Sequence, residues 1–223
     1  DVVALGAREA DERCQLNHGA WEGIKEMGLT GIPFDEQWGG AGMDTLSYIL
    51  AVEEISRVCG STGLTLAAHT SLGTYPIYAW GQATLKEKYL PALCSGEYMG
   101  AYGLTEPGAG SDSAGTKTIG VRDGDDYVIN GAKCFITNGS YAKPFIITIQ
   151  TDSSLGAKGI VAIVVDGDTE GFHVEKGEAK LGMRGSDWTN LVFQDCRVPA
   201  ENVLGDPAEG FSTFMKTLEG GRI

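Results

Sequence analysis

The sequence predicts an α+β fold in which a helical bundle precedes an antiparallel β-barrel or sandwich. Apolar residues recur at helical spacing up to residue 96, alternate with polar residues over 97–206, and return to helical spacing from residue 207. Dipeptides that tolerate a positive φ, as tight hairpins require, punctuate the alternating part: Asp123-Gly124, Asn130-Gly131, Asn138-Gly139 and Asp166-Gly167. We therefore expect an all-α domain (1–96), a β domain (97–206) and the start of a second α domain (207–223).

Within the first domain, Asp44 is placed to cap a helix that continues to residue 59. The face that we expect this helix to bury consists of Tyr48, Ile49, Leu50, Val52, Ile55 and Cys59. Residues 61–80 are apolar on all sides, as in the inner helix of a bundle, and residues 83–93 are amphipathic. After the β domain, one further apolar helical face is formed by Phe211, Phe214, Met215 and Leu218.

The β domain contains candidate strands at 117–122, 127–129, 145–150, 160–165 and 191–193. No helix-length insert separates them, whereas parallel neighbours need a crossover of about a dozen residues or more. We therefore expect the strands to pair antiparallel.

Composition excludes several classes of protein. The 223 residues carry 42% hydrophobic and 21% charged side chains, and no apolar run approaches the ~20 residues that a membrane helix needs. A net charge of −13 opposes binding of nucleic acid, which depends on clustered Lys and Arg. We expect neither a membrane nor a nucleic acid as partner.

The five cysteines lie at positions 14, 59, 94, 134 and 196 without a CxxC pair, which argues against a zinc site and a disulfide framework. The histidines at 18, 69 and 173 show no spacing typical of metal ligands or a catalytic triad. We expect no metal site and a reducing compartment. As a separate expectation, we favour the bacterial cytoplasm over the mitochondrial matrix as the location.

The most informative stretch is residues 102–112, Tyr-Gly-Leu-Thr-Glu-Pro-Gly-Ala-Gly-Ser-Asp. Leu104 and Thr105 can present backbone and hydroxyl groups to a flat heterocycle, while the glycines let the backbone approach a phosphate that Ser111 can hydrogen-bond. The stretch is not the GxGxxG fingerprint of a dinucleotide-binding Rossmann fold.

Two further blocks, Lys133–Gly139 and Leu181–Asp187, follow in order. The three blocks resemble the acyl-CoA dehydrogenase family, in particular its short-chain or butyryl-CoA dehydrogenase-like members, and they match its N-terminal and middle domains. The resemblance implies that a C-terminal helical domain is missing, because the sequence stops at residue 223 in a helical pattern. It also implies a homotetramer in the full-length form.

The resemblance implies FAD as cofactor and a reaction that forms a trans-2,3 double bond in an acyl-CoA thioester. Tyr102, Leu104 and Thr105 are expected to border the isoalloxazine ring, and Ser111 is expected to meet the pyrophosphate. Phe135 offers an aromatic face where many members carry Trp, and Thr137 offers a hydroxyl and an amide near flavin N5 and O4. The cofactor-binding residues implied are Tyr102, Leu104, Thr105, Ser111, Phe135, Ile136 and Thr137.

The substrate-binding residues implied are Ser111, Lys158 and Arg222, with plain surface charge as the alternative for the two cations. Glu106 is expected to support its loop, and Arg184–Asp187 to form a structural turn. The family's α-proton base usually comes from the C-terminal domain, and in one branch from a position that matches Gly221 here. We therefore name no catalytic residue, and we expect residues 1–223 alone to be inactive.

The resemblance also implies an electron-transferring flavoprotein as acceptor instead of a nicotinamide. Two alternatives stay open: an acyl-CoA oxidase or related flavin monooxygenase of the same fold, and a non-catalytic flavin-fold fragment. Acyl chain length is not fixed by the sequence.

Overall fold

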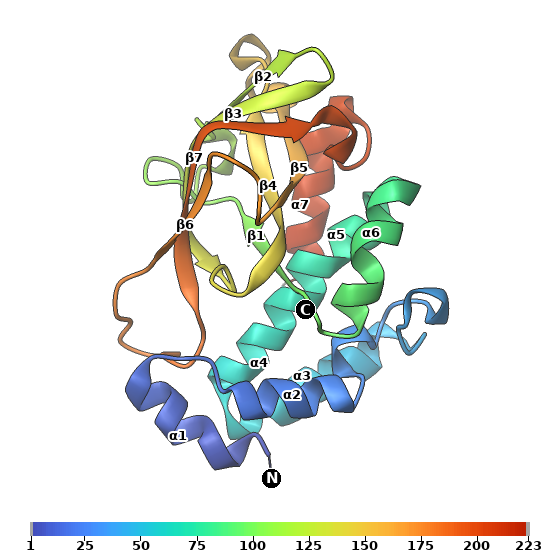
Figure 1. Ribbon diagram of the computed structural model, residues 1–223, viewed down its shortest axis with the longest axis vertical. Helices are drawn as coiled ribbons and strands as arrows, with labels where there is room; N and C mark the ends of the chain where they lie inside the picture. The colour runs from blue at the N-terminus through green and yellow to red at the C-terminus, as the bar shows by residue number, and fades with distance from the viewer. Residues whose placement is uncertain (1, 222–223) are drawn as a thin grey trace.

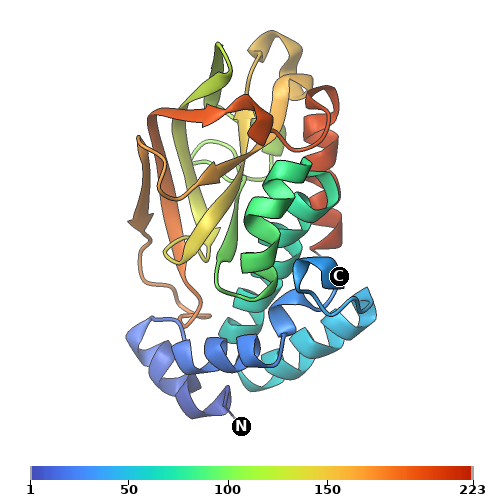
Figure 2. The same cartoon turned by 45° about the vertical axis from the view of Figure 1, so that its right-hand side comes forward.

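The computed structural model describes residues 2–221. Figure 1 shows α1–α4 gathered beneath a curled sheet, and Figure 2 shows α5–α7 standing along one side of that sheet. A π-helix, Ala68–Thr74, joins α4 to α5. The α-helices are α1 (Ala4–Arg13), α2 (His18–Glu26), α3 (Thr45–Val58), α4 (Gly60–Ala67), α5 (Tyr75–Trp80), α6 (Ala83–Cys94) and α7 (Gly210–Gly220).

The helical part precedes the β part and a helix follows it, so the predicted fold class is confirmed. The strands form one sheet in the order β1-β4-β2-β3-β7-β6, with β5 also paired to β4. Their bounds are β1 (Met99–Gly103), β2 (Ile119–Asp123), β3 (Asp126–Thr137), β4 (Ala142–Gln150), β5 (Ile160–Asp166), β6 (Phe172–Lys176) and β7 (Trp188–Pro199).

The sheet is mixed, so the expectation of purely antiparallel pairing was wrong in one region. β1 runs parallel to β4, and β2 meets β4 in parallel at Ile119 and Gln150. The crossover from β1 to β4 consists of a loop and the β2–β3 hairpin, so a parallel pair forms without a crossover helix.

One predicted turn was also wrong. Asn130-Gly131 lies inside β3, where the register with β7 shifts and Gly131 adopts a φ of 149°. The dipeptide marks a β-bulge, the other common use of glycine in a strand. Asp123-Gly124 does form the expected β2–β3 turn, since Asp123 pairs with Asp126.

The start of α3 follows the prediction, because the Asp44 carboxylate accepts a hydrogen bond of 2.8 Å from the Ser47 amide. Its buried face is narrower than expected. Ile55 is buried, whereas Leu50 is 51% exposed. Val52 packs beside Ile55 in the core, whereas Tyr48, Ile49 and Cys59 are only half-buried.

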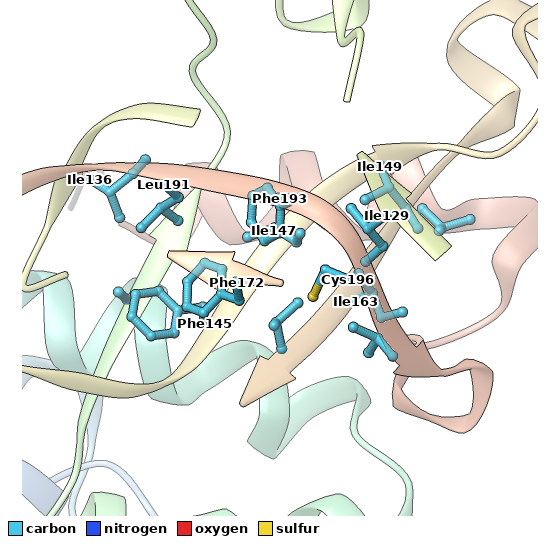
Figure 3. Packing of buried hydrophobic residues seen from close by; sticks show 14 of the residues in the cluster. Ile129, Ile136, Phe145, Ile147, Ile149, Ile163, Phe172, Leu191, Phe193 and Cys196 are labelled. Carbon is cyan, nitrogen blue, oxygen red and sulfur yellow. The ribbon is translucent and has the colours of Figure 1, made fainter. Parts of the chain in front are cut away.

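The middle strands are buried on both faces. Figure 3 shows Ile147 of β4 and Ile163 of β5 inside the curled sheet, in a cluster with Phe193 of β7. Their neighbours along the strands, among them Ile146, face the other way into a second cluster with Phe214 of α7. Helices therefore cover the outer face of β4 and β5.

The outer face is more open at the joined ends of β3 and β7. Phe135 is exposed there, Thr137 and Trp188 are half-buried, and the intervening Ile136 and Thr189 point inward. Among the helices within residues 2–221, none combines the length and the hydropathy that a membrane span requires.

Candidate functional site

A bulge in β3 joins the first two sequence blocks. The register with β7 passes from Lys133–Leu191 to Ile136–Thr189, so Cys134 and Phe135 oppose a single residue. The amide of Cys134 leaves the ladder and donates a 2.8 Å hydrogen bond to the carbonyl of Thr105. Phe135 adopts a φ of 63°. Bulges redirect side chains in this way, and here the bulge turns Phe135 outward beside the first block.

A buried ion pair makes the second connection between these blocks. Lys133 Nζ lies 2.7 Å from Glu106 Oε1, with side-chain exposures of 0% and 5%. The Glu106 carboxylate also accepts hydrogen bonds from the amides of Lys117, at 2.7 Å, and Thr118, at 3.0 Å. Lys133 donates to the Thr148 hydroxyl at 2.9 Å. The Glu106 carboxylate thus connects its loop to two other segments. These are the residues that precede β2 and the part of β3 next to the bulge.

The electrostatics of the pair follow from its burial. Burial lowers the pKa of Lys133 to about 8, against the opposing effect of the Glu106 charge. Burial also opposes ionisation of Glu106, but Lys133 and the hydrogen bonds from Thr118 and Lys117 outweigh it and hold the Glu106 pKa below its ordinary value. The Glu106 carboxylate is therefore charged at neutral pH. Its hydrogen bonds and its ion pair hold the loop in place, which is the supporting role expected for Glu106.

The rest of the first block faces outward. Glu106 and Ala109 exchange two backbone hydrogen bonds of 3.0 and 3.1 Å around a tight turn, which leaves Gly110 and Ser111 exposed. A Cβ at Gly110 would meet no atom within 4 Å, and its φ is not in the left-handed region. The fold itself does not require glycine there, so the small residue fits the close approach of a ligand phosphate.

The predicted cofactor residues divide into two groups. Leu104, Thr105 and Thr137 are half-buried, and Phe135 is 66% exposed, so their side chains reach the surface of the block junction. The side chains of Tyr102 and Ile136 are buried, so a ligand at this surface could reach these two residues only through their backbone atoms.

Tyr102 stacks on Phe214 with ring centroids 4.3 Å apart and donates its hydroxyl proton to the Phe214 carbonyl at 3.0 Å. Ile136 is 1% exposed and lies beside Leu191 in the β core, as Figure 3 shows. The two side chains are buried on opposite faces of the sheet: Tyr102 packs in the outer cluster with Phe214 of α7, and Ile136 packs in the inner cluster with Leu191.

Lys158 lies apart from the block junction. It is exposed in the turn Ser153–Gly159 and lines a cavity of about 360 Å³ with Ser212 and Lys216 of α7. The turn Ser113–Gly115, just after Ser111, lies beside Ser153–Gly159. Arg222 lies outside the described residues.

The third block supports the end of the second. The Asp187 carboxylate accepts hydrogen bonds from the Ser140 amide at 2.8 Å and the Ser140 hydroxyl at 2.9 Å. The Asp187 carbonyl accepts one from Asn138 at 3.3 Å. The expected structural role for Arg184–Asp187 agrees with these contacts.

Sequence reasoning missed two residues of the site. Lys133 received no role, although a lysine in an otherwise apolar strand is a signal for a buried partner. Trp188 also received none, and it stacks on Phe135. Nothing local to Trp188 in the sequence indicates that contact, because the two residues lie on different strands.

The junction offers a flat aromatic face, two threonine hydroxyls and an exposed glycine-serine loop, which together suit a flat heterocycle joined to phosphate. Over residues 2–221, no group of three or more His, Cys, Asp or Glu side chains is arranged to hold a metal ion. The fold and the junction define a β domain that follows a helical domain and carries a candidate site for such a heterocyclic ligand.

Comparison with known families identifies the class. Residues 1–97 match the acyl-CoA dehydrogenase N-terminal domain, and residues 101–196 match the acyl-CoA dehydrogenase middle domain. The chain belongs to the acyl-CoA dehydrogenase family.

Individual relatives agree. The short-chain specific acyl-CoA dehydrogenase of Clostridium acetobutylicum is 53% identical over 205 residues, covering 91% of this chain and 54% of that protein. Butyryl-CoA dehydrogenase of Megasphaera elsdenii superposes with a TM-score of 0.94 at 42% identity, over 99% of this chain and 58% of the other.

A chain in a structure of an electron transferring flavoprotein of Acidaminococcus fermentans gives a TM-score of 0.96 at 44% identity, over 100% of this chain and 58% of the other. The chain spans about half the length of the curated relatives it matches.

Proposed function

We propose that the full-length protein is an FAD-dependent acyl-CoA dehydrogenase that converts a short-chain acyl-CoA thioester to its trans-2-enoyl form. The observation that carries this proposal is the junction of the first two blocks through the Cys134–Thr105 hydrogen bond and the Lys133–Glu106 ion pair. The junction sets an outward aromatic face next to a glycine-serine loop. FAD or its reduced form is bound in two solved relatives.

The residues would hold the cofactor as follows. Phe135 would pack on the isoalloxazine ring, Thr105 and Thr137 would hydrogen-bond its polar edge, and Ser111 would bind the pyrophosphate. When bound, FAD supplies the acceptor for the β-hydride of the substrate. Leu104 and Phe135 would exclude water from one face of the ring, which strengthens electrostatic interactions there.

Glu106 does not serve as the α-proton base in this proposal. Its carboxylate is buried against Lys133, and its lowered pKa makes it a weak proton acceptor. We keep the base unassigned within residues 2–221.

Ser111 and Lys158 are proposed to meet the coenzyme A part of the substrate, together with Arg222. The exposed position of Lys158 beside the turn that follows Ser111 supports this assignment. Its cavity with Lys216 adds a second cation in a chain of net charge −13, where local cations must attract a phosphate.

We propose an electron-transferring flavoprotein as electron acceptor, a homotetramer as the assembly and the bacterial cytoplasm as the location. The bacterial relative with 53% identity and the structure that includes an electron transferring flavoprotein support the first and last of these. The division at residues 96 and 206 remains part of the proposal.

An acyl-CoA oxidase of the same fold is the competing function, because it would use the same junction. A 33% identical solved relative is a prolyl acyl carrier protein oxidase. Access of oxygen to reduced flavin distinguishes the two activities.

An anaerobic titration of the FAD-loaded, full-length protein with butyryl-CoA tests the proposal. Bleaching of the flavin absorption, followed by slow reoxidation in air and rapid reoxidation by an electron-transferring flavoprotein, is expected. Rapid reoxidation by air would indicate an oxidase. An unchanged flavin spectrum would contradict both activities and leave a non-catalytic flavin-binding protein.

A further inference from the structure

Trp188 is held in one position at the edge of the block junction. Its ring stacks on Phe135 with centroids 5.2 Å apart and planes at 29°. Its indole N–H donates a 2.8 Å hydrogen bond to the Glu178 carbonyl. The Phe135 ring therefore has one face covered by an indole that is itself fixed, while Phe135 stays 66% exposed.

A glycine makes room for this indole. A Cβ at Gly177 would lie 2.4 Å from a ring atom of Trp188, closer than real contacts allow. The Gly177 amide also donates to the Trp188 carbonyl at 3.1 Å. The backbone at Gly177 thus forms the floor on which the indole lies, and any larger residue would displace it.

The strand register places Trp188 with the predicted cofactor residues. Trp188 pairs with Thr137, and directly paired residues of antiparallel strands share one face of the sheet. Phe135 lies two residues before Thr137 on the same outward side. Trp188, Thr137 and Phe135 therefore form one continuous surface.

The conformation of Phe135 needs such a support. A φ of 63° is unfavourable for a bulky residue that has a Cβ, and it persists where surrounding contacts determine it. On one side the Cys134–Thr105 hydrogen bond fixes the bulge, and on the other the indole contacts the ring.

We infer that Trp188 is a positioning residue for the flavin: it holds Phe135 in the bulged conformation, with the free face of the ring turned toward the isoalloxazine. The inference rests on the proposed function, since it assigns a role toward FAD. Trp188 itself acts through Phe135.

The test compares variants of the full-length protein. Trp188→Ala should weaken FAD binding roughly 3- to 10-fold, the range expected for loss of one aromatic pair, and shift the visible flavin spectrum. Trp188→Phe should restore both properties because it keeps a stacking face. Gly177→Ala, which retains the indole but displaces it, should resemble Trp188→Ala.

Trp80→Ala is the matched control, because Trp80 is also half-buried and contacts another aromatic ring, that of Tyr75, in the helical part. It should leave FAD affinity and spectrum unchanged. A crystal structure of apo Trp188→Ala should show Phe135 out of its left-handed conformation.

Three outcomes separate the possibilities. Weakened FAD binding in Trp188→Ala with rescue by Trp188→Phe supports the inference. Unchanged affinity and spectrum in a Trp188→Ala protein, beside a wild type that binds FAD, would overturn it and leave the proposed function intact. A wild type that binds no FAD would contradict the proposed function and the inference together.

Discussion

Lys133 Nζ lies 2.7 Å from Glu106 Oε1, and this contact joins two sequence blocks through residues that are 27 positions apart in the chain. Both groups are almost fully removed from solvent, so each charge depends on the other. Lys133 lies on β3 next to the bulge that displays Phe135, so the pair anchors that part of the strand. Integrity of the bulge and stability of the fold are therefore coupled.

Replacing Glu106 by Gln should leave the Lys133 ammonium buried without a counter-charge. Loss of one partner of a buried pair costs about 3–5 kcal/mol, so the free energy of unfolding by denaturant should fall by this amount. Glu54→Gln is the control, since Glu54 pairs with Arg57 at the surface and should lose less than about 1 kcal/mol.

The double variant Glu106→Leu/Lys133→Met should recover most of that loss, because it removes both buried charges together. Equal free energies of unfolding for Glu106→Gln and wild type would mean that the ion pair does not stabilise the fold.

His69 should make the fold sensitive to mild acid. It is fully buried; Nδ1 accepts a hydrogen bond from the Gly100 amide, so Nε2 carries the proton and donates to the Leu93 carbonyl at 3.1 Å. Burial lowers its pKa from 6.5 to about 4. The unfolded state therefore binds more protons between these values, and stability should fall as pH decreases from about 6.5 to about 4.

The loss attributable to His69 is about 3 kcal/mol in total. Unfolding measured across this pH window should give a flatter profile for His69→Gln, whereas His173→Gln, at an exposed position, should retain the wild-type slope. Parallel profiles for His69→Gln and wild type would rule out His69 as the source.

Ser111 and Thr137 should affect the cofactor in different ways. Ser111→Ala removes a charge-assisted hydrogen bond to phosphate, worth about 1.5–3 kcal/mol, and should weaken FAD binding without altering the flavin spectrum. Thr137→Val should shift the spectrum or the reduction potential of bound FAD. Ser154→Ala, at an exposed serine in the turn Ser153–Gly159, serves as control. Identical FAD retention in Ser111→Ala and wild type would show that Ser111 does not bind the pyrophosphate.

The electron acceptor gives a further prediction. Reduced enzyme should be reoxidised by an electron-transferring flavoprotein, and NADH alone should not reduce the bound flavin, because the chain lacks the GxGxxG fingerprint. Stopped-flow mixing of oxidised enzyme with NADH checks this. Bleaching of the flavin by NADH in the absence of a partner protein would contradict the proposed electron acceptor.

Local sequence signals predicted much of the fold. Asp44 marked the start of α3, and Asp123-Gly124 marked a hairpin, because caps and turns depend on neighbouring residues. β1 is absent from the five candidate strands, because all five of its residues are buried and no alternation appears. Its parallel pairing with β4 depends on a distant segment, which local patterns do not encode.

The three blocks were identified from the sequence, and the structure brings the first two of them together. The contacts that shape their junction were not predicted. Cys134 to Thr105, Lys133 to Glu106 and Phe135 to Trp188 each join separate elements. The burial of Tyr102 against α7 and of Ile136 inside the sheet also depends on tertiary packing, so the sequence blocks alone could not show which of these residues present only their backbone to a ligand.

A crystal structure of the full-length protein with FAD tests the central claim most directly. The account predicts the isoalloxazine ring against Phe135, with Thr105 and Thr137 within hydrogen-bond distance of its polar edge and the pyrophosphate at Ser111. FAD bound away from the junction of the first two blocks, with Phe135 and Thr137 facing solvent, would contradict it.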